Sequence, residues 1–235
     1  MSTSLLKVDE ATSSMISLIA SLADNKGALG RRFGEWAVSA PTIESAVALA
    51  AMAQDEIGHA RSTYPVLAKL GVDRDEDRLD AGRPLPILEQ GLADWASVIA
   101  ANVAVDGILT TFVASARDSA IEPLAQRAKK ILQEEGAHRV HAEAWVKRIC
   151  RANGPDAQLL RQRVVEFWDQ AARWPGPDDQ PGYKAAIEAG MVSEGPRLIR
   201  ERMHEWITEL MHAEGAGVRL DEPRDWSAWN EAIRL

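Results

Sequence analysis

Two short stretches of the sequence place a glutamate three residues before a histidine: QDEIGH at residues 54–59 and QEEGAH at residues 133–138. Residues three apart lie on one face of an α-helix. The side chains of each pair, Glu56/His59 and Glu135/His138, can therefore point toward the same site. Carboxylate and imidazole ligands suit iron or manganese, and zinc can occupy such a site adventitiously. Two such pairs, with one carboxylate from each of two further helices, hold a pair of metal ions in a four-helix bundle. The pattern therefore predicts a carboxylate–histidine metal centre.

Two further pairs have the same spacing, Glu201/His204 and Glu209/His212, so spacing alone does not choose among the four. They fall in a later helix whose apolar stripe contains Met203 and Trp206. His204 lies about 100° off that stripe, because consecutive helical residues are 100° apart. We expect these two pairs to lie on a solvated face, and the metal ligands to be Glu56, His59, Glu135 and His138.

Asp106 interrupts the apolar stripe of the third long helix, between Val103 and Leu109. A buried carboxylate without a partner costs several kcal/mol, so Asp106 needs a positive partner there. A metal ion is the first candidate, and a buried ion pair with an arginine is the alternative. We take Asp106 as the fifth metal ligand.

The first helix supplies no obvious carboxylate. Glu35 lies three residues from the turn at residue 38, roughly 15 Å from the level of Glu56, so a surface ion pair explains it better. Asp24 points away from the apolar stripe, whereas Lys26 completes that stripe between Leu22 and Leu29. Lys26 is thus expected to reach the centre as a candidate catalytic residue. We predict that it reduces the metal capacity from two ions to one or none.

Apolar residues recur at helical spacing throughout the chain, and no segment alternates with the period of a strand. We expect helices over residues 9–38, 46–70, 87–115, 123–152, 156–172, 183–189 and 196–213, an acidic loop over 73–80, and a tail over 221–235. This outline indicates an all-α, ferritin-like four-helix bundle with additional C-terminal helices. It is expected to form one domain, 1–235, with a core bundle over about 9–153 and further helices over about 156–235.

The composition limits the class of protein. A net charge of −8 gives no electrostatic reason to expect nucleic acid or an anionic membrane as a partner. The single cysteine, Cys150, excludes an internal disulfide and a cysteine-rich zinc site. The N-terminal apolar stretch is too short and interrupted for a membrane span, so a cytoplasmic protein is expected.

The sequence resembles the phenylacetic acid catabolic protein family, and within it the catalytic subunit of the bacterial phenylacetyl-CoA epoxidase. The matching stretches are spread over residues 36–233. They are Trp36 with Ala40-Pro41-Thr42, Gln54-Asp55-Glu56 with Gly58-His59, Val105-Asp106-Gly107, Glu134-Glu135 with His138, Phe167-Trp168, Gly176-Pro177 with Asp179, Asp225-Trp226 and Trp229-Asn230-Glu231.

The resemblance implies a di-iron oxygenase that activates O2 and oxidises an aromatic or acyl-CoA compound in phenylacetate catabolism. It also implies a flavin and iron–sulfur reductase as electron donor, and a homodimer or a related structural bundle subunit as partner. Glu56, His59, Asp106, Glu135 and His138 match family ligands. The family's first-helix glutamate falls at Lys26.

The presence of Lys26 where the family has a glutamate leaves three interpretations. The chain is an oxygenase with an altered iron site, a non-catalytic structural subunit in which Lys26 replaces a metal's charge, or a ferritin-type metal-binding protein. The five retained ligand types favour the first. Trp95, Trp145, Trp168 and Trp174 either line a pocket or belong to the core.

Overall fold

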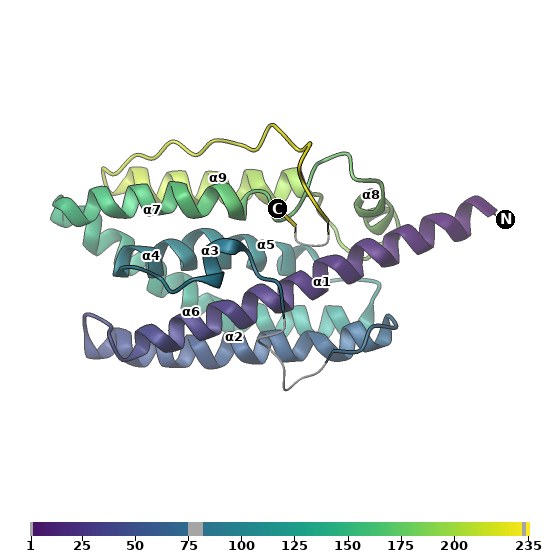
Figure 1. Ribbon diagram of the computed structural model, residues 1–235, viewed down its shortest axis with the longest axis horizontal. Helices are drawn as coiled ribbons and strands as arrows, with labels where there is room; N and C mark the ends of the chain where they lie inside the picture. Colours follow the sequence, from purple (N-terminus) through teal and green to yellow (C-terminus); the bar gives the residue numbers. More distant parts are fainter. Residues whose placement is uncertain (1, 75–81, 232–233) are drawn as a thin grey trace.

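The computed structural model describes residues 2–74, 82–231 and 234–235, with the side chains of residues 2–9 left out. Over this part of the chain every regular element is helical, as expected (Figure 1). The elements are α1 (Ser2–Ala37), α2 (Ile43–Lys69), α3 (Pro86–Glu89), α4 (Trp95–Ala100), a π-helix (Ala101–Asp106), α5 (Gly107–Ser115), α6 (Glu122–Ala152), α7 (Pro155–Ala171), α8 (Pro181–Glu188) and α9 (Pro196–Ala213).

The first two helices form an antiparallel pair that runs along one side of the molecule (Figure 1). Thr42 caps the start of α2 by accepting a hydrogen bond from the Ser45 amide at 3.2 Å. Gly30 allows the close approach of the two helices, since a Cβ there would lie 2.8 Å from Ile57 Cγ1 and 3.0 Å from the Ala53 carbonyl oxygen. α1 also begins earlier than expected, at Ser2 rather than residue 9. The acidic loop expected over residues 73–80 lies mostly outside the described residues.

The helix expected over residues 87–115 is wrong at its start. Pro86–Glu89 forms the separate helix α3, and the long helix begins at Trp95, where the Asp94 side chain accepts from the Ser97 amide at 2.7 Å. Asp94 is a strong N-cap residue that fixes this start, whereas the apolar pattern runs on through both elements. The long helix is also interrupted by a π-helix that ends at Asp106. π-Helical turns of this kind are frequent at functional sites.

The C-terminal helices cover the other side of the bundle. α7 and α9 lie against the central α4–α5 helix and α6, and the C-terminal segment runs back over them (Figure 1). Arg234 holds the C-terminal segment against residues 174–175. Its buried guanidinium donates hydrogen bonds to the carbonyl oxygens of Trp174 and Pro175, at 2.7 and 2.8 Å. The expected tail over residues 221–235 contains turns but no helix in its described part.

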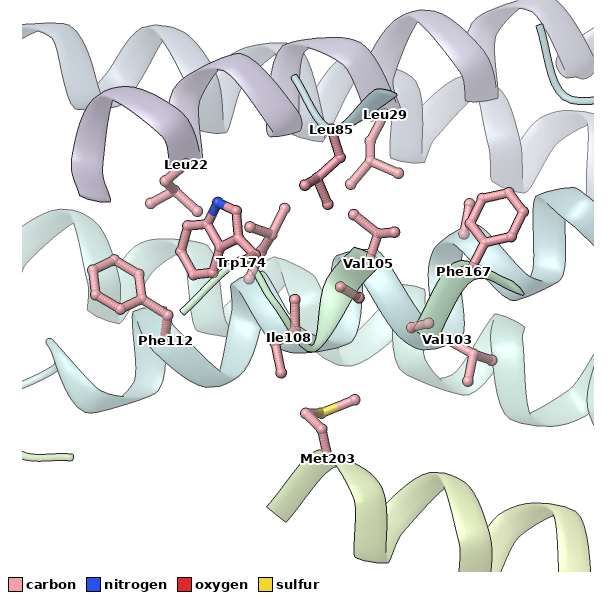
Figure 2. Packing of buried hydrophobic residues seen from close by; sticks show 14 of the residues in the cluster. Leu22, Leu29, Leu85, Val103, Val105, Ile108, Phe112, Phe167, Trp174 and Met203 are labelled. Carbon is pink, nitrogen blue, oxygen red and sulfur yellow. The ribbon is translucent and has the colours of Figure 1, made fainter. Parts of the chain in front are cut away.

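The central helix is the middle of the hydrophobic core. Figure 2 shows Leu22 and Leu29 of α1 on one side of Val105 and Ile108, with Met203 of α9 on the other. Segment Trp95–Ser115 is long and apolar enough to cross a membrane, but 83% of its most apolar window is buried inside the bundle. It is therefore the core helix of the bundle, whose apolar surface is satisfied by packing.

Trp168 and Trp174 also belong to this core. Of the two alternatives expected for them, a pocket or the core, the structure shows the core. Trp95 and Trp145 form an aromatic cluster, with ring centroids 5.0 Å apart.

Candidate metal centre

The structure brings together all six residues singled out in the sequence. Lys26 comes from α1, Glu56 and His59 from α2, Asp106 from the end of the π-helix, and Glu135 and His138 from α6. None of the six is more than 4% exposed. The prediction that these side chains meet at the centre of the bundle is therefore correct.

Lys26 lies in the middle of the cluster. Its Nζ is 3.1 Å from Glu56 Oε1 and 2.5 Å from Asp106 Oδ1, and it also donates to Glu135 Oε1. Burial alone would lower the pKa of Lys26, but the three carboxylates outweigh it and raise this pKa well above its ordinary value. An ammonium has three hydrogens, and each of them here meets a carboxylate from a different helix.

His138 faces the same carboxylates from the other side. Its Nδ1 is 3.2 Å from Glu56 Oε1, 3.3 Å from Asp106 Oδ2 and 3.4 Å from Glu135 Oε2. Burial disfavours the charged imidazole, but hydrogen bonds to Asp106 and Glu56 raise the pKa of His138 to about 11. Without a metal ion, His138 therefore acts as a second cation in the cluster.

The carboxylates differ in their protonation. Burial, together with the neighbouring Asp106 charge, raises the pKa of Glu56 to about 8. Burial acts in the same direction on Asp106, but Lys26 and His138 outweigh it and hold the pKa of Asp106 far below its usual range. Asp106 is therefore the firmly ionised member of the group, and Glu56 is the one that readily accepts a proton.

The imidazole of each histidine contacts a carboxylate from the other helix, outside the central cluster. His138 Nε2 on α6 lies 3.4 Å from Asp55 Oδ2 on α2, and His59 Nε2 on α2 lies 2.9 Å from Glu134 Oε2 on α6. Such outer contacts fix the ring orientation and turn the inner nitrogen toward the centre. Sequence reasoning missed this role, although the signal was present: an acidic residue directly precedes each ligand glutamate.

Two buried polar atoms in the cluster have no hydrogen-bond partner, Glu56 Oε2 and His59 Nδ1, which lie 3.9 Å apart. His59 Nδ1 is 3.2 Å from Glu135 Oε1, outside the geometry of a hydrogen bond. Unpaired buried polar atoms are costly, so a water molecule between these two atoms would complete this side of the cluster.

The donor set fits a metal ion on one side of the cluster. One ligand atom each from Glu56, Asp106, Glu135 and His138 lie within 4.8 Å of one another. Three carboxylates and one imidazole are a suitable set for iron or manganese. The His59 side is less complete, because the first helix contributes Lys26 there instead of a carboxylate.

The centre can be reached from the surface by two openings. A cavity of about 370 Å³ includes Asp106 and Glu135 in its wall, and its other lining residues include Thr110, Met203 and Trp206. A smaller pocket of about 180 Å³ reaches His59 and Glu134 between α2 and α6. Of the four tryptophans considered as pocket residues, none lines the larger cavity.

The remaining sequence candidates lie away from the centre, as expected, but His204 is half-buried against the C-terminal segment rather than on a solvated face. Glu35 is exposed and pairs with Arg32, and Asp24 pairs with Arg74 at 2.9 Å. His204 Nε2 on α9 lies 3.2 Å from the Leu220 carbonyl oxygen, and Glu201 pairs with Arg197.

Comparison with known proteins identifies the relatives of this bundle. The sequence pattern that defines the phenylacetic acid catabolic protein family matches residues 2–232. The chain belongs to this family. It is similar to two different components of 1,2-phenylacetyl-CoA epoxidase from Escherichia coli (strain K12). It is 26% identical to one of them over 185 residues, covering 76% of this chain and 73% of the relative. It is 26% identical to the other over 222 residues, covering 85% of this chain and 71% of the relative.

The family membership confirms the resemblance seen in the sequence and agrees with the helical bundle. The chain has the same percentage identity to both components. Its Lys26 lies at the centre of the carboxylate cluster.

Proposed function

We propose that this protein is an oxygenase subunit of the phenylacetyl-CoA epoxidase type, cytoplasmic, with iron held by its carboxylate–histidine centre. Its substrate is an aromatic or acyl-CoA compound of phenylacetate-type catabolism. The observation that carries the proposal is the cavity of about 370 Å³ whose wall includes Asp106 and Glu135. A purely structural subunit has no need of an opening from the surface to its buried carboxylates.

Glu56, Asp106, Glu135 and His138 would hold the iron, and bound ferrous iron would supply the electrons that reduce O2. Manganese is the other metal that this donor set accepts. Asp55 orients His138, and the Lys26 ammonium donates to all three carboxylates and holds Asp106 ionised by lowering its pKa. Without the ion, burial raises the pKa of Glu56 to about 8, so binding of the metal ion would displace a proton from this carboxyl group.

The larger cavity would receive the substrate. Its wall contains small and apolar residues next to the centre, and Arg139 and Arg202 lie at its edge. Arg139 stacks over the Trp206 ring at 4.7 Å, which holds its guanidinium in place. Arginine is well suited to bind the phosphates of a coenzyme A thioester.

The partners would be a second copy or a related structural bundle subunit, with a flavin and iron–sulfur reductase as electron donor. The relatives support this arrangement, since both are named as subunits of one epoxidase.

The test is turnover by the iron-loaded protein. The protein is loaded with ferrous iron without oxygen and mixed with phenylacetyl-CoA, an epoxidase-type reductase with NADPH, and O2. One oxygen atom should enter the thioester and the other should leave as water, giving a product about 16 mass units heavier. Absence of this product from an iron-loaded protein, with and without a related bundle subunit, would contradict the proposal.

The second candidate function is a non-catalytic structural subunit. It is favoured by one observation, the contact of Lys26 with all three carboxylates, which balances much of their charge without a metal ion. In that case the protein stays folded and metal-free after iron loading, and it raises the activity of a catalytic relative when the two are mixed.

A further inference from the structure

We infer that the centre binds a single divalent metal ion, on the Asp106–His138 side, and that the Lys26 ammonium permanently occupies the place of a second cation. This inference deepens the proposed function by fixing how many ions the site holds and which residues bind them. It concerns metal binding, so it can succeed or fail separately from oxygenase activity.

The first step is the position of the ammonium. Lys26 Nζ lies 3.1 Å from Glu56 Oε1 and 2.5 Å from Asp106 Oδ1, and it also contacts Glu135 Oε1. All three ammonium hydrogens are thereby used within the cluster. A second metal ion bound to the same oxygen atoms would have to displace the ammonium, which has nowhere to go in a fully buried site.

The second step concerns the carboxylate oxygen atoms that do not contact Lys26 and are therefore available to a metal ion. Asp106 and Glu135 each present one oxygen to Lys26 and the other to His138 Nδ1, at 3.3 and 3.4 Å. Donor atoms bound to one metal ion at about 2.1 Å in neighbouring positions lie about 3.0–3.4 Å apart. Each carboxylate can therefore bridge the ammonium and one metal ion, as it would otherwise bridge two metal ions.

The third step is the difference between the two histidines. His59 Nδ1 is 3.2 Å from Glu135 Oε1, the oxygen that already accepts from Lys26, and 3.9 Å from Glu56 Oε2. An ion bound to His59 would share its carboxylate oxygen with the ammonium and would be repelled by it. On the His138 side, two carboxylate oxygens are free of the ammonium, Asp106 Oδ2 and Glu135 Oε2, and Glu56 Oε1 is shared with it. On the His59 side, only Glu56 Oε2 is free of the ammonium.

The fourth step is the charge of the centre. Glu56, Asp106 and Glu135 carry three negative charges when ionised. One ammonium and one divalent ion carry three positive charges, so the buried cluster is neutral with both imidazoles uncharged. A second divalent ion would leave two positive charges in excess in a buried site, which is strongly disfavoured.

The experiment measures metal per chain after anaerobic loading with ferrous iron or Mn(II) and removal of free metal. We expect one ion per chain in the natural protein. Lys26→Glu should raise this to two ions, because it supplies the missing carboxylate and removes the ammonium. Lys69→Glu, an exposed lysine on α2 with the same charge change, should leave the value at one.

A second pair of variants locates the ion without changing Lys26. His59→Gln should retain one ion, and His138→Gln should lose it. Two ions in the natural protein, none after loading, or loss of the ion in His59→Gln with retention in His138→Gln would each overturn the inference. One bound ion without any oxygenase activity would contradict the proposed function and leave this inference standing.

Discussion

Asp55 on α2 and His138 on α6 approach to 3.4 Å, so a half-buried carboxylate of one helix braces the innermost imidazole of another. His59 and Glu134 repeat the arrangement with the helices exchanged. If the metal ion is bound on the His138 side, the two braces differ in importance. Asp55→Ala should weaken Mn(II) binding about 10–100-fold, the usual effect of removing such an outer contact. Glu134→Ala is the matched control and should change the dissociation constant much less. Equal losses in both variants would argue against a one-sided site.

Lys26 should be essential to the stability of the metal-free protein. Lys26→Met keeps the length of the side chain but leaves buried carboxylates without their cation. Breaking a buried ion pair by removing one partner costs about 3–5 kcal/mol. Urea unfolding in the presence of a chelator should show a loss of this size, and Lys69→Met on the surface should show almost none. A change below about 1 kcal/mol would mean that the carboxylates are neutralised in another way.

Gly30 should be required for the close contact of α1 with α2. A Cβ at this position would lie 2.8 Å from Ile57 Cγ1 and 3.2 Å from Glu56 Cβ. Gly30→Ala should therefore destabilise the fold by about 1–3 kcal/mol and weaken metal binding, because it pushes Lys26 and Glu56 apart. Gly34→Ala, one turn later, meets only Ala53 Cβ at 3.7 Å and should be neutral or slightly stabilising. Thermal unfolding of the two variants side by side makes the comparison.

Gly136 should control access of the substrate to the centre. It lines the cavity beside Glu135, and a Cβ added there meets no atom within 4 Å. Gly136→Leu should fill the cavity and reduce turnover of the thioester at least tenfold while the bound metal stays unchanged. Ala137→Leu places the same side chain on the exposed face next to it and should leave turnover intact. If the Gly136→Leu variant turns over normally, the substrate enters by another route.

His141 should make the protein less stable in mild acid. Both of its ring nitrogens are buried without a hydrogen-bond partner, and burial, with a smaller effect of His138, lowers the pKa of His141 to about 4. The unfolded chain takes up this proton near pH 6.5, so stability falls as the pH drops from about 6.5 to 4. His141→Phe should remove on the order of 1–2 kcal/mol of this decline, allowing for partial exposure of the ring. Superimposable pH–stability curves for the two proteins would exclude the effect.

The centre can be anticipated from the sequence because helical geometry is regular. Spacing together with a place on the long bundle helices points to Glu56/His59 and Glu135/His138. A place in an apolar stripe points to Asp106 and to Lys26. The same arithmetic correctly sets Glu35 aside. These conclusions need only the rise and rotation of an α-helix.

The remaining features depend on contacts between distant residues. The break between α3, which ends at Glu89, and the helix that Asp94 caps is not visible in the apolar pattern, and neither is the π-helix before Asp106. The crosswise contacts of Asp55 and Glu134 depend on how α2 and α6 are aligned. The burial of Arg234 against Trp174 depends on the path of the C-terminal segment over the bundle. None of these alignments is encoded in the residues of a single helix.

The π-helix Ala101–Asp106 has a consequence for the evolution of this helix. A π-helical turn contains one residue more than an α-helical turn, so the two halves of the helix are offset by one position. Deleting one residue from this segment would restore a continuous α-helix and rotate Trp95 relative to Phe112 by about 100°. One end would then lose its packing, or Asp106 would leave the centre. Substitutions in this segment can thus be tolerated more readily than any change in its length, and related sequences that keep an acidic residue here should align without gaps across it.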